Sequence, residues 1–415
     1  MKQVAFALIL TLSCTGVMVA TNGGIDISIF LVTCALAVPF LMVYFLIWKG
    51  RFSFYGIWLI GAYILLNYGL NIHTAKFTSV VYSAIFLVSF LVVMNCWHHL
   101  PRREFIFVLK TIIVIYFVNV LVSQALVAAN VPYEYLGGFF HRLYDERIEA
   151  VRYYGFSSEP SYAAFIVLVS FYALYRLSGK RHKRDWLAYG ALVVYQIVAF
   201  RSIYGYLLAM AVSAVIVYRE LPRRAFYLLP FFLLVLGVAT NFVVLTDQGG
   251  RLIRVGSALI TGEVGSLSDL NLLDASLFMR IAPLLEYLQS ANLVDYRFYL
   301  GHGAMTSTDF FTNAFYTHVH PDSDILRAGF LPAFLYDYGL VGAAIVLAWA
   351  SKTISRRRLS VPNLFLLMAL FNANFNTQLF WFIIIVFAVA KLYQPGGLRI
   401  DVTSNAVMPK EVGAQ

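Results

Sequence analysis

The sequence predicts an all-α protein, a polytopic membrane helical bundle of about twelve spans with one large extracytoplasmic loop. Three observations support this fold class. Hydrophobic residues make up 60% of the 415 residues, charged residues make up 13%, and the mean hydropathy is +0.75. This composition excludes an ordinary soluble globular protein. Apolar runs suited to spanning helices recur along the chain, and short basic segments separate many of them.

The apolar runs are centred near residues 12, 36, 62, 88, 117, 169, 193, 210, 236, 338, 367 and 385. The first run, Val4–Ala20, has some features of a signal peptide. Met18-Val19-Ala20 is a poor cleavage site, however, and another apolar run follows almost at once, so we expect an uncleaved first helix. The chain 1–415 is therefore predicted to be a single integral-membrane domain. No internal repeat is visible, which argues against an inverted-repeat transporter.

Basic residues predict the orientation of the spans. With the N-terminus in the cytoplasm, the short outside turns hold only Lys76 and Arg201, and the inside loops hold many more basic residues. This asymmetry follows the positive-inside rule and accounts for the formal charge of +10 without a nucleic-acid partner. The inside loops hold Lys49, Arg51, Arg102, Arg103, Lys180, Arg181, Lys183, Arg184, Arg219, Arg223, Arg224, Lys352, Arg356, Arg357 and Arg358.

Two segments on the predicted outside are long. They are the extracytoplasmic loop Ala129–Glu159 (129–159) and the large extracytoplasmic loop Thr246–Asp324 (246–324). Long connections between packed elements are usually functional when they are not disordered. Apolar residues recur at helical spacing through Leu277–Leu288, which predicts an amphipathic helix lying on the surface.

Arg201 interrupts a 33-residue apolar stretch, Trp186–Tyr218, that is basic at both ends. The stretch is too long for one crossing, and both flanks are predicted to be cytoplasmic, so we expect a helical hairpin with Arg201-Ser202 at its tip. Each arm of about 15 residues spans roughly 22 Å, which would leave the tip recessed below the far surface. A guanidinium there suits an anionic head group such as a lipid-linked diphosphate. The alternative is an arginine that snorkels to the interface or pairs with an acidic neighbour.

The segment Arg152–Ser161 leads directly into a predicted span. Pro160 suits the first helical position, and the free N–H groups of that helix end offer a second anion site. Glu159 has two interpretations. It accepts a proton from a sugar hydroxyl, or it caps the helix and balances Arg152.

The large outside loop supplies further candidates. Among its arginines we single out Arg280, because the amphipathic helix could place it over the hairpin tip. A solvated face is a competing interpretation for Arg251, Arg254 and Arg297. Near the loop's end, His320 is a candidate general base at neutral pH.

The motif His318-Val319-His320-Pro321-Asp322 also allows a metal site, because three ligands would share one face of an extended strand. Pro321 disturbs regular pairing, and no second ligand cluster is evident, so no metal or other cofactor is predicted. Asp337 would lie near mid-bilayer in a straight helix. Gly339 and Gly342 offer an alternative, a short interfacial helix that ends near Tyr338 and is followed by the true span.

The order of these features resembles the bacterial O-antigen polymerases of the O-antigen polymerase and ligase superfamily. The resemblance covers most of the chain through its many spans, a motif before a central helix, a hairpin tip, a large outside loop and a Tyr-Gly-Leu-x-Gly start of a late span. Glu159-Pro160-Ser161 is similar to the polymerases, since ligases tend to carry Asn-Pro-Asn there. The tip differs, because Arg201-Ser202 replaces the usual Ser-Arg. The matching residues are Arg152, Gly155, Phe156, Glu159, Pro160, Ser161, Arg201, Ser202, Gly301, Gly303, His320, Asp324, Gly339 and Gly342.

The resemblance implies a GT-C-like glycosyltransferase on the outer (periplasmic) face of the bacterial inner membrane. Its donor and acceptor would both be polyprenyl-diphosphate-linked oligosaccharides, and its product O-antigen or exopolysaccharide. Such enzymes are similar in being metal-independent, so fixed cations must stabilise the diphosphate leaving group. We therefore expect Arg152, Arg201 and Arg280 to bind the diphosphate. We expect His320, oriented by Asp324, or else Glu159, to deprotonate the acceptor; a ligase, a lipid-linked oligosaccharide flippase or another transporter is the alternative.

Overall fold

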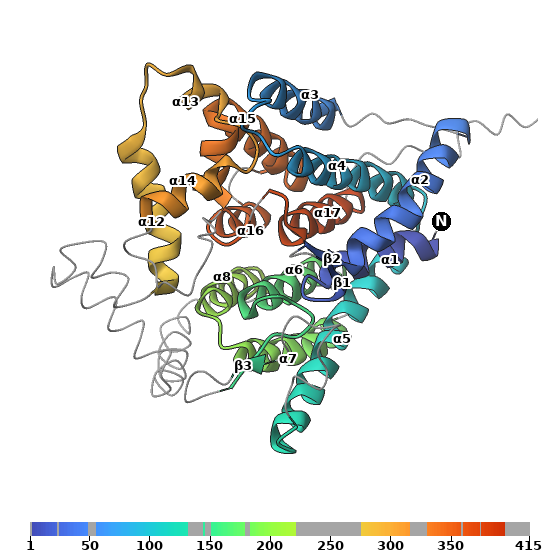
Figure 1. Ribbon diagram of the computed structural model, residues 1–415. Coiled ribbons are helices and arrows are strands. Elements are labelled where there is room, and N and C mark those ends of the chain that lie inside the picture. Colours follow the sequence, from blue (N-terminus) through green and yellow to red (C-terminus); the bar gives the residue numbers. More distant parts are fainter. Residues whose placement is uncertain are drawn as a thin grey trace, which may run out of the picture.

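The computed structural model describes residues 2–22, 25–48, 55–131, 144–145, 151–178, 183–220, 275–315, 330–357, 360–373 and 375–394. Within these ranges the protein is helical apart from two short two-stranded antiparallel sheets (Figure 1), which confirms the predicted all-α class. The elements are α1 (Lys2–Ser13), β1 (Met18–Asn22), β2 (Ile25–Ser28), α2 (Ile29–Trp48), α3 (Tyr55–Leu70), α4 (Phe77–His98), α5 (Arg102–Ala128), β3 (Tyr144–Asp145), β4 (Arg152–Tyr153), α6 (Pro160–Ser178), α7 (Lys183–Phe200), α8 (Ile203–Glu220), α12 (Ala275–Ser290), α13 (Tyr296–Leu300), α14 (Thr306–Phe315), α15 (Phe330–Ile354), α16 (Val361–Ala369) and α17 (Gln378–Leu392).

Two helices, α6 and α17, form the centre of the bundle. Every residue of Leu379–Ala390 in α17 is at most 2% exposed, and so is every residue of Ala163–Val169 in α6. Helices that are apolar on all sides are expected in such interiors. The two contact each other; α17 also contacts α1, α4, α15 and α16, whereas α6 contacts α5, α7 and α8. Figure 1 shows these helices arranged around the central pair.

Among the described residues, four helices are long and apolar enough to cross a membrane, judged by length and composition. Several other helices are apolar but shorter, and α16, with 9 residues, spans only about 14 Å. The predicted run near residue 236 lies outside the described residues. The helices therefore fit a membrane protein, and the total of about twelve spans stays a prediction. The four candidate spans are Phe77–His98, Arg102–Ala128, Pro160–Ser178 and Leu331–Ile354.

The expected first helix differs from the structure. The apolar run Val4–Ala20 does not form one helix, because α1 ends at Ser13 and the rest of the run turns into β1, which pairs with β2. Gly16 lies in this turn, and a Cβ at that position would lie 2.4 Å from the backbone of Ser157. The β-branched Val17 and Val19 favour extended backbone after the turn. Apolarity alone could not locate this helix end, since the contact that fixes it is remote in the sequence.

The kink in α15 resolves the position of Asp337. Gly339 has φ 67° and ψ 179°, so α15 consists of two helical pieces rather than one straight span. The predicted break after Tyr338 is confirmed. Asp337 ends the first piece and is 7% exposed, so its carboxylate faces protein.

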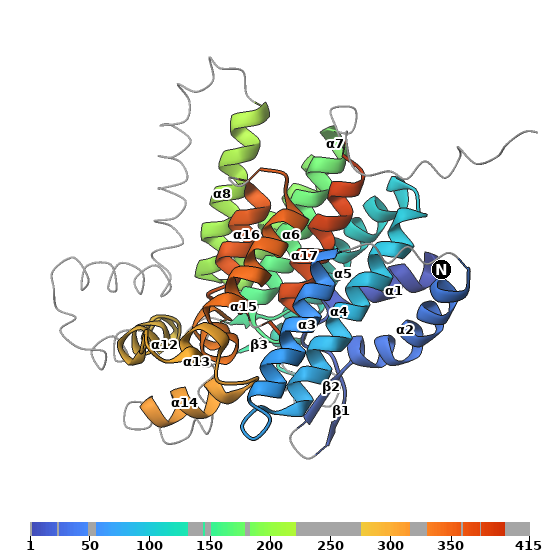
Figure 2. The same cartoon turned by 90° about the horizontal axis from the view of Figure 1, so that it is seen from above.

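Helices α12, α13 and α14 form a small cluster at one corner of the molecule, beside α15 (Figures 1 and 2). Their own core contains Phe278, Ala282, Tyr287 and Phe311, which are at most 5% exposed. The helix predicted through Leu277–Leu288 is confirmed as α12. It packs on α14 and α15 with one part of its surface and leaves another part exposed.

Candidate functional site

The predicted hairpin is present. Helices α7 and α8 are separated only by Arg201 and Ser202, and their far ends point to the same side of the molecule (Figure 2). Ser202 caps α8, because its Oγ accepts a hydrogen bond from the Gly205 N–H at 3.2 Å and its carbonyl accepts one from the Tyr206 N–H at 2.9 Å. A Cβ at Gly205 would lie 2.7 Å from Ala164 of α6, so the hairpin tip is packed closely onto the central helix.

Arg201 occupies an unusual backbone position. Its φ is 49°, in the left-handed region that residues other than glycine rarely adopt. Such conformations cost on the order of 1–3 kcal/mol and persist only when the surrounding structure imposes them. The side chain is half-buried. Within the described residues, the ion pairs join other residues and none includes Arg201. A half-buried cation without a carboxylate partner in this part of the chain is suited to an external anion.

The structure brings the predicted Arg152 segment to this tip. Strand β4 contacts α7, and its pairing with β3 sets Arg152 across from Asp145. Burial raises the pKa of the Tyr153 phenol, and the positive charge of Arg201 opposes that rise. The charge of Arg201 also acts on the Tyr206 hydroxyl, so Arg201 lies near both tyrosines.

Gly155 allows the close approach of this segment. It has φ 61°, and a Cβ there would lie 2.8 Å from the Tyr116 ring and 3.6 Å from Phe200, the residue before Arg201. Only glycine tolerates this conformation and this spacing without strain. Gly155 therefore lies beside the ring of Phe200, which directly precedes the hairpin tip, and the joint role of Arg152 and Arg201 stays a prediction.

Residues at and just after the end of α1 support the segment that contains Phe156 and Ser157. The Gly16 N–H donates to the Phe156 carbonyl at 2.8 Å, and the Tyr116 hydroxyl lies 2.9 Å from the Ser157 Oγ while donating to the Ser13 carbonyl at 2.5 Å. Sequence reasoning did not assign these supports, because about 100 residues or more separate Ser13 and Gly16 from Tyr116 and Phe156. Tyr153 and Tyr206 were also missed as members of the site. Their proximity to Arg152 and Ser202 in the sequence was the available signal.

Glu159 directly precedes α6. Its carbonyl accepts the Ala163 N–H at 3.1 Å, and its carboxylate accepts the Ser161 hydroxyl at 3.0 Å. Pro160 occupies the first position of α6 as predicted, and the capping interpretation of Glu159 stays a prediction because its carboxylate bonds a side-chain hydroxyl and, among the described residues, no backbone N–H. The Glu159 side chain is exposed, so a catalytic role stays a prediction.

The remaining predicted site residues are less fully described. Arg280 lies on α12, and Figures 1 and 2 draw the start of that helix on the side where α8 begins, but the Arg280 side chain lies outside the described part. His320 and Asp324 fall in the range 316–329, which the structure does not describe, as does the alternative metal motif. In the described ranges, no group of three His, Cys, Asp or Glu side chains could hold a metal ion.

The glycines 301, 303 and 339 have a structural role. Gly301 and Gly339 have φ 88° and 67°, and a Cβ on either would lie within 2.5 Å of backbone atoms across the contact between α13 and α15. Helix α3 secures the contact, since the Tyr63 hydroxyl donates to the Tyr338 carbonyl at 2.6 Å and Asn67 Nδ2 donates to the Leu300 carbonyl at 2.7 Å. We call this contact between residues 299–307 and 336–339 the glycine clamp.

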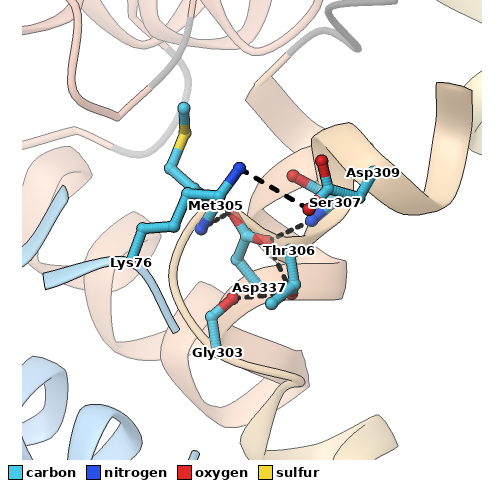
Figure 3. Close-up of polar contacts among 7 residues, drawn as sticks. All are labelled: Lys76, Gly303, Met305, Thr306, Ser307, Asp309 and Asp337. Carbon is cyan, nitrogen blue, oxygen red and sulfur yellow. Dashed lines mark hydrogen bonds and ion pairs between the residues drawn. The ribbon is translucent and has the colours of Figure 1, made fainter. Parts of the chain in front are cut away.

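Asp337 completes the glycine clamp (Figure 3). Its carboxylate accepts hydrogen bonds from the Met305 N–H at 3.0 Å, the Ser307 N–H at 2.8 Å and the Thr306 hydroxyl at 3.3 Å. These groups lie at the start of α14, where a negative charge also compensates the helix dipole. Asp337 is therefore the anchor of α14, and its buried charge is explained by the fold.

Three comparisons with known proteins gave no match: no protein-family model, no curated protein and no solved structure matches this chain. The arrangement of the described residues is thus the basis for a functional proposal.

Proposed function

We propose that this chain is a membrane glycosyltransferase that polymerises polyprenyl-diphosphate-linked oligosaccharide repeat units into O-antigen or exopolysaccharide. The observation that carries the proposal is the cationic hairpin tip. Arg201 is held half-buried in a strained conformation beside the Arg152–Tyr153 strand. Helix α6 begins directly after Glu159 and helix α8 directly after Ser202. The N-terminal ends of helices favour bound anions.

The chemistry of the leaving group matches this tip. As the bond from sugar to diphosphate breaks, negative charge develops on the departing oxygen, and fixed cations lower the barrier. In the proposed complex Arg152 and Arg201 bind the diphosphate, and Arg280 of α12 joins them from the large loop. Guanidinium groups suit this task because their planar donors bind phosphate oxygens in pairs.

The acceptor hydroxyl needs a base. We assign this role to His320, with Asp324 orienting its ring, and to Glu159 as the alternative. Glu159 lies at the start of α6, four residues from the Gly155 contact with the tip segment. A neutral histidine accepts a proton near pH 7, whereas a carboxylate needs a raised pKa to do so efficiently.

The proposed setting is the bacterial inner (cytoplasmic) membrane, crossed about twelve times, with the site facing the periplasm. Its basis is the basic composition of the five short loops at the opposite ends of the helices. The segments 129–159 and 246–324 are then the extracytoplasmic loops. Membrane lipid and the lipid-linked oligosaccharide are the expected partners, together with a possible chain-length regulator.

The direct test uses purified protein in lipid nanodiscs with lipid-linked repeat units. A ladder of oligomers is expected from the native chain. Arg201→Ala should reduce oligomer formation by about 100-fold or more, because it removes a fixed donor to the leaving group. Arg103→Ala is the matched control, since Arg103 is largely exposed at the start of α5. Full activity of Arg201→Ala would disprove the diphosphate assignment.

The same assay separates the alternatives. A ligase would transfer finished glycan in one step and give no ladder. A flippase or other transporter would move the lipid-linked oligosaccharide across sealed vesicles without extending it, and such proteins usually place charges along a path at mid-membrane.

A further inference from the structure

Helices α12 and α13 and the turn between them expose a run of large apolar and aromatic side chains. Val294 is 93% exposed, Leu293 65% and Leu288 59%. These values contrast with the buried side of the same cluster, where Phe278 and Ala282 are at most 1% exposed. We define the α12–α13 tip as the exposed side chains of Leu285, Leu288, Leu293, Val294, Tyr296 and Tyr299.

Backbone donors of the tip are bonded within the tip itself. The Val294 N–H donates to Asn292 Oδ1 at 3.0 Å, and the Arg297 N–H donates to Asp295 Oδ1 at 2.9 Å. The N–H groups of Asp295 and Phe298 donate to nearby carbonyls, each at 3.1 Å. A segment that enters a lipid environment must satisfy its own polar backbone groups, and this turn does so at the four positions named.

The charged side chain next to the tip has the chemistry of a membrane interface. Arg297 Nε donates to the Tyr296 hydroxyl at 3.3 Å, and its guanidinium lies 5.8 Å from the centre of the Tyr296 ring. Tyrosine and arginine are typical of the head-group level, where an apolar body meets lipid and a polar end meets water. The tip therefore combines apolar side chains with an interfacial rim.

The segment that follows the α12–α13 tip is bonded to the connection between α3 and α4, which also exposes apolar side chains. The glycine clamp joins α13 to α3, and the Lys76 N–H at the start of α4 donates to the Ala304 carbonyl at 3.0 Å. Near this junction Ile72 is 55% exposed, and Phe77, the first residue of the candidate span α4, is 61% exposed. Figure 2 shows the α12–α14 cluster at the end of the molecule where α3 connects to α4.

From this connection and the exposure of the tip, we infer that the α12–α13 tip docks into the head-group and upper acyl region of the bilayer leaflet that surrounds the α3–α4 connection. We name lipid as the occupant for three reasons. The exposed apolar side chains gather on one part of the cluster, the turn that carries them bonds its own backbone groups, and the neighbouring helix α4 is a candidate span. This docking is independent of the proposed enzymatic activity. It makes the cluster a membrane-anchored element rather than a domain surrounded by water.

The test measures lipid contact at single positions of the full chain. Cys14, Cys34 and Cys96 are replaced by Ala, and Val294→Cys is labelled with an environment-sensitive nitrobenzoxadiazole fluorophore. The protein is placed in nanodiscs of phosphatidylethanolamine and phosphatidylglycerol that contain phosphatidylcholine with a nitroxide at acyl carbon 5. Quenching of the label by the nitroxide lipid is expected.

Two matched positions calibrate the result. Val118→Cys reports lipid contact, because Val118 is 50% exposed within the candidate span α5. Asn313→Cys is the polar comparison, because Asn313 is exposed on α14 and is expected to face water. Quenching at Val294→Cys that approaches Val118→Cys and exceeds Asn313→Cys supports the docking. Quenching at the level of Asn313→Cys overturns it.

A second copy of the chain is the competing occupant. Oxidative cross-linking of unlabelled Val294→Cys into dimers in nanodiscs that hold two copies, together with the absence of lipid quenching, would overturn the proposal. A second variant tests the apolar contact itself. Val294→Asp should lower the quenching of a label at Leu288→Cys without lowering the Tm, because Val294 contributes almost no buried surface to the fold.

Discussion

The hairpin tip and the glycine clamp both place a charged residue near the N-terminal end of a helix: Arg201 precedes α8, and the Asp337 carboxylate lies at the start of α14. Their environments differ. Asp337 is 7% exposed and accepts three hydrogen bonds from residues 305–307, whereas Arg201 is half-buried and joins no ion pair among the described residues. A charge whose bonding capacity is used within the protein stabilises the fold. A cation that the fold holds in a strained position without neutralising it is the better candidate for a ligand.

The largest effect on stability is expected for Gly339→Ala in the glycine clamp. The added Cβ would lie 2.3 Å from the Tyr299 carbonyl oxygen, and the residue would keep a φ of 67°. Backbone strain and overpacking together should lower the free energy of unfolding by about 3 kcal/mol or more. Thermal unfolding in detergent measures the change. Gly69→Ala is the control, because no atom lies within 4 Å of its added Cβ; equal Tm values for the two variants would contradict the clamp.

Asp337→Asn should have the next largest effect. The amide keeps the shape of the side chain but replaces one carboxylate oxygen with an NH2 group, which then faces either the Met305 N–H or the Ser307 N–H, so at least one hydrogen bond is lost in a buried place. A loss of about 1–3 kcal/mol in the free energy of unfolding is expected. Asp309→Asn is the comparison, since Asp309 is exposed and lies 3.5 Å from Lys76 in a surface ion pair (Figure 3). The clamp assignment fails if Asp309→Asn proves the more destabilising of the two.

A smaller effect is expected from the pH dependence of the glycine clamp. His302 stacks on Tyr336, with ring centres 4.1 Å apart, and burial lowers the pKa of its imidazole below the ordinary value of 6.5. The folded protein therefore favours the neutral ring. The stabilisation is complete above the unfolded-state pKa and is lost as the pH falls through the folded-state pKa. The Tm should decrease below about pH 6.5, and His302→Gln should remove that part of the decrease. An unchanged pH profile in His302→Gln would exclude this role.

The smallest effect on stability is expected at the hairpin tip. Arg201→Gly removes the charge and relieves the left-handed strain, while it adds freedom to the unfolded chain, so the free energy of unfolding should change by less than about 1 kcal/mol. Polymerisation should nevertheless be lost. The free energy of unfolding and the polymerisation activity are measured on one sample. Arg201→Gly should mainly lose activity, whereas Asp337→Asn should mainly lose stability. If Arg201→Gly were strongly destabilised, the hairpin tip would have a structural role, as the glycine clamp does.

Several elements were predictable because their signals are local. The tip at Arg201-Ser202 followed from a polar pair inside an apolar stretch, and the start of α6 at Pro160 followed from helix-capping chemistry. The break after Tyr338 followed from Gly339. In each case the decisive residue lies within a few positions of the feature that it determines.

Other features depend on contacts between distant segments. The run Val4–Ala20 was expected to be one helix, yet Gly16 packs against Ser157 and the chain turns into a strand. Asp337 was unexplained in the sequence because its three donors lie about 30 residues earlier. Tyr153 gains its relation to Arg201 only when β4 lies against α7.

The sequence by itself determined the all-α class, the apolar helices and the hairpin with an arginine at its tip, because hydrophobic periodicity and helix-breaking residues act over one or two turns. The tertiary structure decided which charged side chains are hydrogen-bonded within the protein, as Asp337 is, and which are candidates for binding a ligand, as Arg201 is. Hydrogen bonds to Asp337 and the approach of Tyr153 to Arg201 join parts of the chain that only packing brings together, and a sequence records those partners without recording their proximity.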